Sequence, residues 1–301
     1  MSQWHLIVDV ALCENCCNCQ LAAKDEYVGN GFPGYSAPHP AHGAGVVRIE
    51  RTVRGTGSQV DAGYLPRMCN HCADAPCVKA APDAITQRPD GIVIIDPVKA
   101  KGRKDIVDAC PYGAVIWNEE LQLPQNWIFD AHLLDQGWKE PRCQQVCPTG
   151  AITSVKASDS EIAVRVRADR LEVLKPELRT NPRVHYRNLH RVTKHFVAGS
   201  VFARSGGIAD CVEGAGVTLL KDGAEVATTE TDAFGDFKFD RLDPGSGPYR
   251  VQIHHPSFGA VIAEAPLAAA SVSLGSIELT PLTTVGAAAI NFTSKRKENG
   301  A

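Results

Sequence analysis

Two short cysteine-rich runs constrain this chain more than any other feature of its sequence. Cys69, Cys72 and Cys77 crowd into nine residues, and a tight loop there can direct three thiolates toward one point. Near the N-terminus, the run Cys13-Glu-Asn-Cys-Cys-Asn-Cys19 repeats the arrangement. Ten of the eleven cysteines precede residue 148, and in a chain without an export signal such clustering favours metal binding over disulfides.

Each run lacks one ligand for a cubane iron–sulfur cluster, which takes four. In ferredoxin-type sequences the fourth cysteine can lie elsewhere in the chain, directly before a proline. The pair Cys-Pro occurs twice, in Ala-Cys110-Pro-Tyr-Gly-Ala and in Val-Cys147-Pro-Thr-Gly-Ala, and this is an internal repeat. A third copy, Ala-Ala81-Pro-Asp-Ala, has an alanine in place of the cysteine and cannot bind iron.

Eight cysteines complete two ligand sets, which predicts two 4Fe-4S clusters. The first set is Cys13, Cys16, Cys19 and Cys147, and the second is Cys69, Cys72, Cys77 and Cys110. Zinc is the alternative, since paired CxxC segments also build tetrahedral zinc sites. The three-cysteine runs and the two Cys-Pro partners favour iron–sulfur clusters.

An arrangement of four clusters would need two further ligand sets, and both are incomplete in this sequence. Their positions are occupied by Ala23, Trp127, Asp130 and Cys143 in one site, and by Ala81, Ala100, Arg103 and Ile106 in the other. Asp130 could in principle bind iron, but its companions at this site argue against it. We expect Cys17 and Cys143 to be free, buried thiols and Cys211 to be inert.

Composition and charge exclude several classes of partner. The formal net charge of −3 indicates neither nucleic acid nor an anionic membrane. Residues 1–10 contain no basic region, twin arginine or signal-length apolar run, and no window reaches the roughly 18 apolar residues of a membrane helix. Taken alone, these features predict a cytoplasmic protein with no membrane span.

The length and the change of pattern along the chain predict two domains of an α+β protein. We expect a duplicated bacterial-ferredoxin-like iron–sulfur domain at 1–157, a helix and linker at 158–196, a β-sandwich at 197–280 and a tail at 281–301. Ser158 and Glu161 form the pattern of a capping box that opens the helix, expected to run to about Val173.

The region from residue 197 predicts an all-β domain of immunoglobulin-like or transthyretin-like type. Turn signals such as Lys221-Asp-Gly223 and Asp243-Pro-Gly245 separate its short alternating segments. The expected strands are Val197–Ala203, Val217–Leu220, Glu225–Glu230, Phe237–Phe239, Tyr249–Ile253 and Ser271–Leu279.

The histidines give no sign of a metal site. His39 and His42 lie in a loop rich in glycine and proline and are expected at the surface. His185, His190 and His195 recur every five residues, which does not place them on one helix face, so they are expected to be surface or packing residues.

Several segments give the chain a resemblance to a known family. They are Phe32-Pro-Gly-Tyr35, Ile49-Glu-Arg51, Cys69–Val78, Asp90–Pro97, Cys110-Pro-Tyr-Gly113, Ala131–Asp135 and Lys175–Leu178. The sequence resembles the iron–sulfur small subunits of molybdenum enzymes of the dimethyl-sulfoxide-reductase type. Within these it is most similar to the small subunits of pyrogallol-phloroglucinol transhydroxylase and anaerobic resorcinol hydroxylase. The resemblance extends over nearly the whole chain.

The resemblance implies a partner subunit that performs the catalysis. A large subunit would bind molybdenum with two pterin cofactors and act on hydroxylated aromatics, while this chain would be the non-catalytic subunit with no active site of its own. The transhydroxylase small subunit is expected to carry three clusters. Here the cluster that would use Ala23, Trp127, Asp130 and Cys143 is missing. In the family four clusters lie in a line, and the two clusters predicted here would occupy its two outer positions.

Two hypotheses follow. In the first, the chain is an electron-transfer subunit that links the molybdenum site to an outside donor or acceptor. In the alternative, it is a mainly structural subunit whose clusters stabilise the fold and the subunit interface, because the inner clusters are lost.

Overall fold

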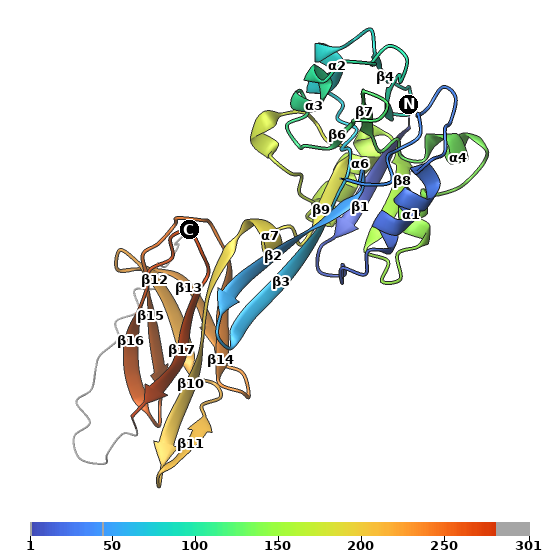
Figure 1. Ribbon diagram of the computed structural model, residues 1–301. Coiled ribbons are helices and arrows are strands. Elements are labelled where there is room, and N and C mark those ends of the chain that lie inside the picture. The colour runs from blue at the N-terminus through green and yellow to red at the C-terminus, as the bar shows by residue number, and fades with distance from the viewer. Residues whose placement is uncertain (1, 44, 281–301) are drawn as a thin grey trace, which may run out of the picture. The chain divides into compact units, whose positions relative to one another are not determined.

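The computed structural model describes residues 2–43 and 45–280, and these form two compact units. The N-terminal unit comprises the described residues up to 54 together with 60–194, and the C-terminal unit comprises 55–59 and 195–280 (Figure 1). The expected tail at 281–301 lies outside the described residues. In the described residues no helix is both long and apolar enough to cross a membrane.

A three-stranded sheet of order β8-β1-β9 runs through the N-terminal unit. Its strands are β1 (Gln3–Asp9), β8 (Ile152–Ala157) and β9 (Val184–Arg187), with β8 antiparallel and β9 parallel to β1. Side chains alternate along a strand, so Leu6 and Val8 of β1 point into the main core while His5 and Ile7 point to the other face. The segment 158–196 thus contributes the strand β9 to this sheet.

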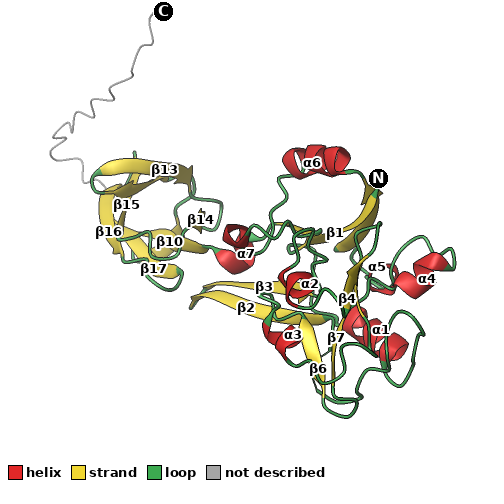
Figure 2. Ribbon diagram, turned by 90° about the horizontal axis from the view of Figure 1, so that it is seen from above, coloured by secondary structure: helices red, strands yellow, loops and turns green. Residues whose placement is uncertain are grey.

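The rest of this unit consists of hairpins, short helices and the loops between them, and most of the cysteines lie in these loops (Figure 2). The hairpins pair β2 (Arg48–Thr56) with β3 (Gln59–Arg67), β4 (Ile85–Gln87) with β5 (Val93–Ile95), and β6 (Val115–Asn118) with β7 (Leu123–Asn126). The helices are α1 (Asn18–Tyr27), α2 (Pro76–Ala80), α3 (Asp105–Asp108), α4 (Ala131–Asp135), α5 (Arg142–Gln145), α6 (Asp159–Ala168) and α7 (His190–Thr193), with a 3-10 turn at Pro176–Leu178.

The sequence repeat corresponds to a repeated local structure. Helix α3 leads into Cys110-Pro and then into β6, and α5 leads into Cys147-Pro and then into β8. In both copies the amide of the glycine three residues on donates to the cysteine carbonyl, from Gly113 at 3.0 Å and from Gly150 at 3.3 Å. Both glycines have positive φ, 58° and 67°, a conformation that favours glycine. The same tight turn therefore presents each thiol at the end of a short helix.

Helix α6 begins with the expected capping box. The Ser158 hydroxyl accepts from the Glu161 amide, and the Glu161 carboxylate accepts from the Ser158 amide. The helix ends at Ala168, earlier than the expected Val173, and Leu171 turns back to donate its amide to the Val166 carbonyl.

We expect Ser158→Ala to lower the free energy of unfolding by about 1 kcal/mol, because the Glu161 amide loses its side-chain acceptor. Urea unfolding of the purified protein measures this change. Val164→Ala, at a 59% exposed position of the same helix, is the control and should leave the midpoint nearly unchanged.

A buried charge network fixes the hairpin β2–β3 to α7 within the N-terminal unit. The Arg54 guanidinium, only 2% exposed, pairs with the Asp61 carboxylate, which also pairs with Arg191. Burial alone would raise the pKa of Asp61, but hydrogen bonds from Arg191 and Arg54 outweigh it and lower the pKa to about 2. The carboxylate thus offsets the cost of burying the Arg54 charge.

Asp61→Ala is expected to destabilise the protein by about 2 kcal/mol, because it removes the carboxylate from a buried guanidinium. Arg54 would keep its bonds to the carbonyls of His190 and Lys194, which limits the loss. Thermal or urea unfolding measures the effect. Glu213→Ala, at an exposed position, is the control, and an equal loss there would contradict the role of the network.

The described part of the C-terminal unit contains strands and turns only. One sheet has the order β11-β10-β14 with β17 paired to β10, and the other has the order β13-β12-β15-β16. The strands are β10 (His195–Ser205), β11 (Ile208–Cys211), β12 (Gly216–Lys221), β13 (Ala224–Glu230), β14 (Asp236–Leu242), β15 (Tyr249–His255), β16 (Gly259–Ala265) and β17 (Val272–Leu279). All six expected segments are strands, and β11 and β16 were not anticipated.

Alternating residues from both sheets form one core in this unit. Val197 and Phe237 come from the first sheet, and Val217, Leu219 and Val251 come from the second. This pairing of two inner faces is what the alternating pattern predicts. The assignment to an immunoglobulin-like or transthyretin-like topology stays a prediction.

Candidate metal centres

Four cysteines line one small cavity in the N-terminal unit. Cys69 and Cys72 lie in the loop that joins β3 to α2, Cys77 lies in the first turn of α2, and Cys110 follows α3. The rest of the wall is mostly apolar and is provided by Ala75, Pro76, Val93, Ile95, Pro111, Tyr112 and Val115, together with Asn70, His71 and Asn126. The structure thus brings together the four residues of the second predicted ligand set.

Burial and mutual repulsion dominate the electrostatics of these thiols. Burial raises the pKa of Cys72 and of Cys77 to about 11, and the neighbouring Cys110 contributes to both shifts. Burial also raises the pKa of Cys69, with Cys110 and Cys77 as the next causes. A positively charged metal reverses this preference, because it stabilises the thiolate and releases the proton.

Polar groups around this cavity reach the sulfur atoms and their loop. The Ala114 amide donates to Cys110 Sγ at 3.4 Å, and the Gln87 side chain donates to the Cys72 carbonyl at 2.7 Å. The Thr180 hydroxyl hydrogen-bonds the Cys72 thiol and lowers its pKa against the effect of burial. Hydrogen bonds to cluster sulfurs tune the reduction potential. Sequence reasoning missed Thr180, because nothing in its local sequence places it beside a cysteine so far away along the chain.

The first predicted ligand set also comes together, at the start of α1. Cys13 and Cys16 lie in the loop after β1, Cys19 lies in the first turn of α1, and Cys147 follows α5. Burial raises the pKa of Cys19 to about 12, and Cys13, Cys147 and Cys16 contribute through their proximity. The Asn18 side chain donates to the Val146 carbonyl at 3.4 Å and links the two segments.

The two sites differ in their access to solvent. Cys16 is exposed and Cys13 is half-buried, whereas Cys69 and Cys72 are buried. Solvent exposure is one of the factors that set cluster potentials. We therefore expect a cluster at Cys13, Cys16, Cys19 and Cys147 to be more accessible to solvent and small reagents than one in the enclosed cavity.

The donor set fits a cubane cluster. Within the described ranges, no three His, Cys, Asp or Glu side chains lie close enough to share a single metal ion. A cubane does not require this, because each of its four cysteines binds a different iron and the sulfurs surround the cluster. That these eight cysteines are the ligands stays a prediction, developed below.

A hydrogen-bonded core surrounds Asp130, in one of the two sites that the sequence leaves incomplete. Asp130 is 2% exposed and accepts from three groups: the Tyr27 hydroxyl, the Trp127 indole at 3.3 Å and the Arg142 amide at 2.7 Å. Ala23 is buried in the same core. Burial raises the pKa of Asp130, which these donors oppose. Its two carboxylate oxygens are thus engaged by protein donors.

Hydrophobic packing fills the other site that the sequence leaves incomplete. Ala81, Ala100 and Ile106 are each 0% exposed and belong to a small core with Ala84, Ile85, Val93, Ile95 and Val115. Arg103 is turned outward and pairs with Asp105 at 2.8 Å.

The remaining cysteines differ from one another. Cys143 is buried, as expected, and burial raises its pKa, with Asp130 and Cys19 as further causes. Cys17 is half-buried rather than buried, because it caps α1 in a left-handed conformation with its thiol near the Asn15 carbonyl. Cys211 is exposed on β11.

The prediction that His39 lies at the surface is wrong. His39 is 7% exposed and stacks on the Tyr27 ring, with centroids 4.8 Å apart. The Ser36 hydroxyl lies 3.2 Å from its Nε2. His39 therefore belongs to the packed region around Asp130, while His42 is exposed as expected.

Comparison with known proteins agrees with the cysteine pattern. Residues 60–157 match a family model described as a 4Fe-4S dicluster domain. The chain is 42% identical over 282 residues to the pyrogallol hydroxytransferase small subunit of Pelobacter acidigallici, and the match covers 93% of this chain and 100% of the relative.

More distant relatives are subunits of other redox enzymes. A tetrathionate reductase subunit of Salmonella typhimurium is 35% identical over 62% of this chain and 73% of the relative. A sulfite dehydrogenase subunit of Allochromatium vinosum is 29% identical over 65% of this chain and 87% of the relative. With its cysteine pattern and its full-length match to the hydroxytransferase small subunit, the chain belongs to the family of iron–sulfur small subunits of dimethyl-sulfoxide-reductase-type molybdenum enzymes.

Proposed function

We propose that this chain binds two 4Fe-4S clusters and transfers electrons as the non-catalytic small subunit of a heterodimeric molybdenum enzyme that acts on hydroxylated aromatics. The cavity lined by Cys69, Cys72, Cys77 and Cys110 carries the proposal, because four thiols from two segments far apart in the sequence converge on it. A 4Fe-4S cluster, when bound, accepts and donates one electron at a time.

The proposal of two clusters, not four, rests on the residues that occupy the other two cluster positions of the family. Asp130 is engaged by three donors, and Ala81, Ala100 and Ile106 pack in an apolar core. Neither position offers a set of thiolates. The repeated order of helix, Cys-Pro turn and strand also supports a duplicated ferredoxin-like domain for the N-terminal unit.

The roles of the surrounding residues follow from their contacts. The cysteines bind the clusters, and the Ala114 amide and the Thr180 hydroxyl stabilise negative charge on Cys110 and Cys72. The apolar wall from Val93, Ile95 and Val115 excludes water from the second site. The exposed position of Cys16 makes the first site the one that meets solvent or a partner surface.

The proposed partner is a large subunit that carries molybdenum with two pterin cofactors and performs the aromatic chemistry. The relative named as a hydroxytransferase small subunit supports both the partner and the substrate class. The alternative of a mainly structural subunit has no support from the relatives, whose names include a reductase and a dehydrogenase.

Iron and acid-labile sulfide, measured per chain on anaerobically purified protein, test the cluster number. Two cubanes give about eight irons and about eight sulfides, and EPR after reduction should show two signals. About twelve irons would mean that a third cluster forms, and about four would mean that one ligand set is wrong.

Consumption of an external acceptor by the assembled enzyme tests electron transfer. If the clusters link the molybdenum site to an outside partner, turnover should reduce an added dye or redox protein in proportion to product. Continued turnover with no acceptor present, at an undiminished rate, would favour the structural role.

A further inference from the structure

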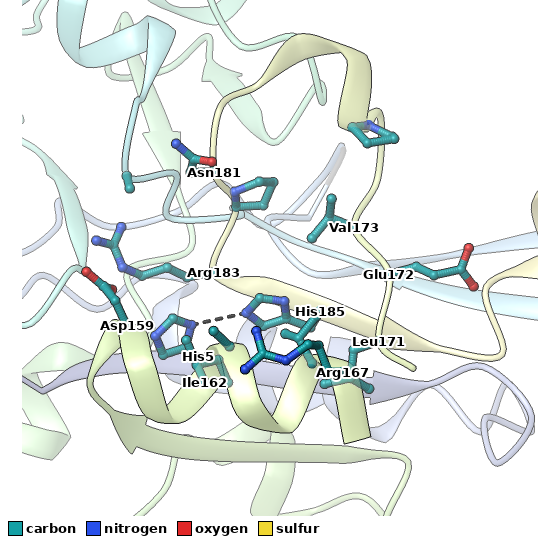
Figure 3. Close-up of a pocket in the computed structure, with 15 residues that line it drawn as sticks. His5, Asp159, Ile162, Arg167, Leu171, Glu172, Val173, Asn181, Arg183 and His185 are labelled. Atoms are coloured by element: carbon teal, nitrogen blue, oxygen red, sulfur yellow. Dashed lines mark hydrogen bonds between the residues drawn. The ribbon is translucent and has the colours of Figure 1, made fainter. Parts of the chain in front are cut away.

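An open cavity of about 730 Å³ lies in the N-terminal unit beside the loop of the second cysteine set (Figure 3). Its walls come from β1, from α6, from the segment 171–183 and from β9. None of the eight predicted ligands lines it, so it is separate from both metal centres. Its volume lies within the range of about 300–1,000 Å³ that is common for small-molecule sites.

Aliphatic side chains form most of this cavity. Ile162 and Val166 contribute from α6, and Leu171 and Val173 contribute from the segment that follows the helix. Ile162 and Leu171 are themselves largely buried. A mostly apolar wall with a few polar groups is typical of sites for small organic molecules.

Two buried histidines provide the polar groups. His5 Nδ1 and His185 Nε2 lie 3.2 Å apart and share a hydrogen bond, as Figure 3 shows. The side chains are 4% and 7% exposed. Their other ring nitrogens, His5 Nε2 and His185 Nδ1, are buried and have no hydrogen-bond partner in the part of the chain that the structure describes.

The shared hydrogen bond determines how many of the two outer nitrogens are donors and how many are acceptors. In a neutral pair one imidazole donates to the other, so one outer nitrogen carries a proton and the other carries a lone pair. This holds for either choice of tautomers. The histidine pair in the cavity wall therefore keeps one unused donor and one unused acceptor just beneath the surface, and leaving buried polar atoms unpaired costs about 1–3 kcal/mol each.

The cavity has no excess charge. Burial lowers the pKa of both His5 and His185 to about 4, so both are neutral at pH 7. Among the charged residues that line the cavity, Asp159 and Glu172 balance Arg167 and Arg183. A neutral ligand therefore suits this site better than an anion or a cation.

Direct hydrogen bonds connect the cavity to the loop of the second cysteine set. Arg183 lines the cavity and donates through Nη1 to the His71 carbonyl at 2.7 Å. The Ala73 amide, next to Cys72, donates to the Asn181 carbonyl at 2.9 Å, and both residues line the cavity. A ligand here would lie against the loop that carries Cys69 and Cys72.

We propose that this cavity binds a neutral, flat ring that carries hydroxyl or carbonyl oxygens, and that its occupancy is sensed by the cluster at Cys69, Cys72, Cys77 and Cys110. The oxygens would pair with the outer nitrogens of His5 and His185, and the ring would pack against Ile162 and Leu171. The sensing part rests on the proposed function, whereas the binding part does not.

Binding of resorcinol to the full chain, without the large subunit, tests the proposal. Isothermal titration calorimetry should find one site per chain, and toluene and benzoate should bind at least tenfold more weakly, because the first lacks oxygens and the second is charged. EPR of the reduced protein should show a change in one of the two cluster signals when resorcinol is added.

Substitutions on α6 locate the site. Ala163 lines the cavity, so Ala163→Trp should fill it and weaken resorcinol binding at least tenfold. Val164, the next residue on the same helix, is 59% exposed and does not line the cavity, so Val164→Trp is the matched control. His185→Phe should also weaken binding, because it removes one outer nitrogen.

The outcomes separate the two proposals. Absence of resorcinol binding, equal binding of toluene, or equal loss in both tryptophan variants would overturn the site. Iron content near zero would overturn the proposed function while leaving calorimetric binding intact. Binding with an unchanged EPR spectrum would overturn the sensing.

Discussion

Cys110→Ala is expected to lower the iron content from about eight to about four per chain, because it removes one of four ligands from a single 4Fe-4S cluster. Cys110 lines the enclosed cavity with Cys69, Cys72 and Cys77, and its place in the turn after α3 leaves no other cysteine in that cavity wall to replace it. Of the two EPR signals of the reduced protein, one should disappear.

Cys147→Ala should also lower the iron content by about half, but it should remove the other EPR signal, since one cubane holds about four irons. Cys147 lies beside Cys13 and Cys19 and outside the enclosed cavity. The comparison of the two variants therefore tests which Cys-Pro cysteine shares a cluster with which three-cysteine run, and not only the number of clusters.

Two cysteines serve as controls for these measurements. Cys211→Ser, at an exposed position on β11, should leave iron content and both EPR signals unchanged. Cys143→Ala should do the same, although Cys143 is buried near Cys19 and Asp130. A loss of iron in Cys143→Ala would mean that Cys143 is a ligand, and the two-cluster assignment would be wrong.

Asp130→Ala is expected to lower the free energy of unfolding by about 3–5 kcal/mol, because three buried donors lose their acceptor and each costs about 1–3 kcal/mol. These donors are the Tyr27 hydroxyl, the Trp127 indole and the Arg142 amide. Tyr27 and Trp127 are 0% and 1% exposed, so water cannot easily replace the carboxylate. Urea unfolding under anaerobic conditions measures the change.

Asp130→Asn separates the contributions of shape and charge. The amide oxygen can still accept from Tyr27 or Trp127, but the amide nitrogen cannot accept from the Arg142 backbone, so we expect a smaller loss of about 1–2 kcal/mol. Iron content should match that of the unsubstituted protein in both variants. A lower iron content in a folded Asp130→Asn protein would instead identify Asp130 as a ligand.

The contacts of Asp130 show how this site is packed without a complete set of ligands. A cubane links four points of a core by covalent bonds, and its removal leaves polar backbone and space to be filled. Here Trp127 packs on Phe129 with centroids 4.8 Å apart, and Asp130 joins Trp127, Tyr27 and the start of α5. Aromatic packing and hydrogen bonds therefore connect α1, the loop before α4 and the start of α5.

Features that depend on local pattern could be predicted from the order of residues alone. Spacing showed the two cysteine runs, the Cys-Pro repeat and the capping box at Ser158, because each is defined by residues a few positions apart. Period-two alternation with turn residues showed six strands of the C-terminal unit. It missed β16, whose Ala-rich segment Gly259–Ala265 has weak strand propensity, and β11, whose four residues are all exposed.

Contacts between distant side chains could not be predicted in this way. His5 and His185 are 180 positions apart and become partners because β1 and β9 are neighbours in one sheet. Tyr27 and Asp130 are 103 positions apart, and their hydrogen bond required α1 and the loop before α4 to pack together. The cause is physical: local spacing is written in the order of residues, whereas contacts between distant side chains depend on where packing of the whole unit places each backbone segment.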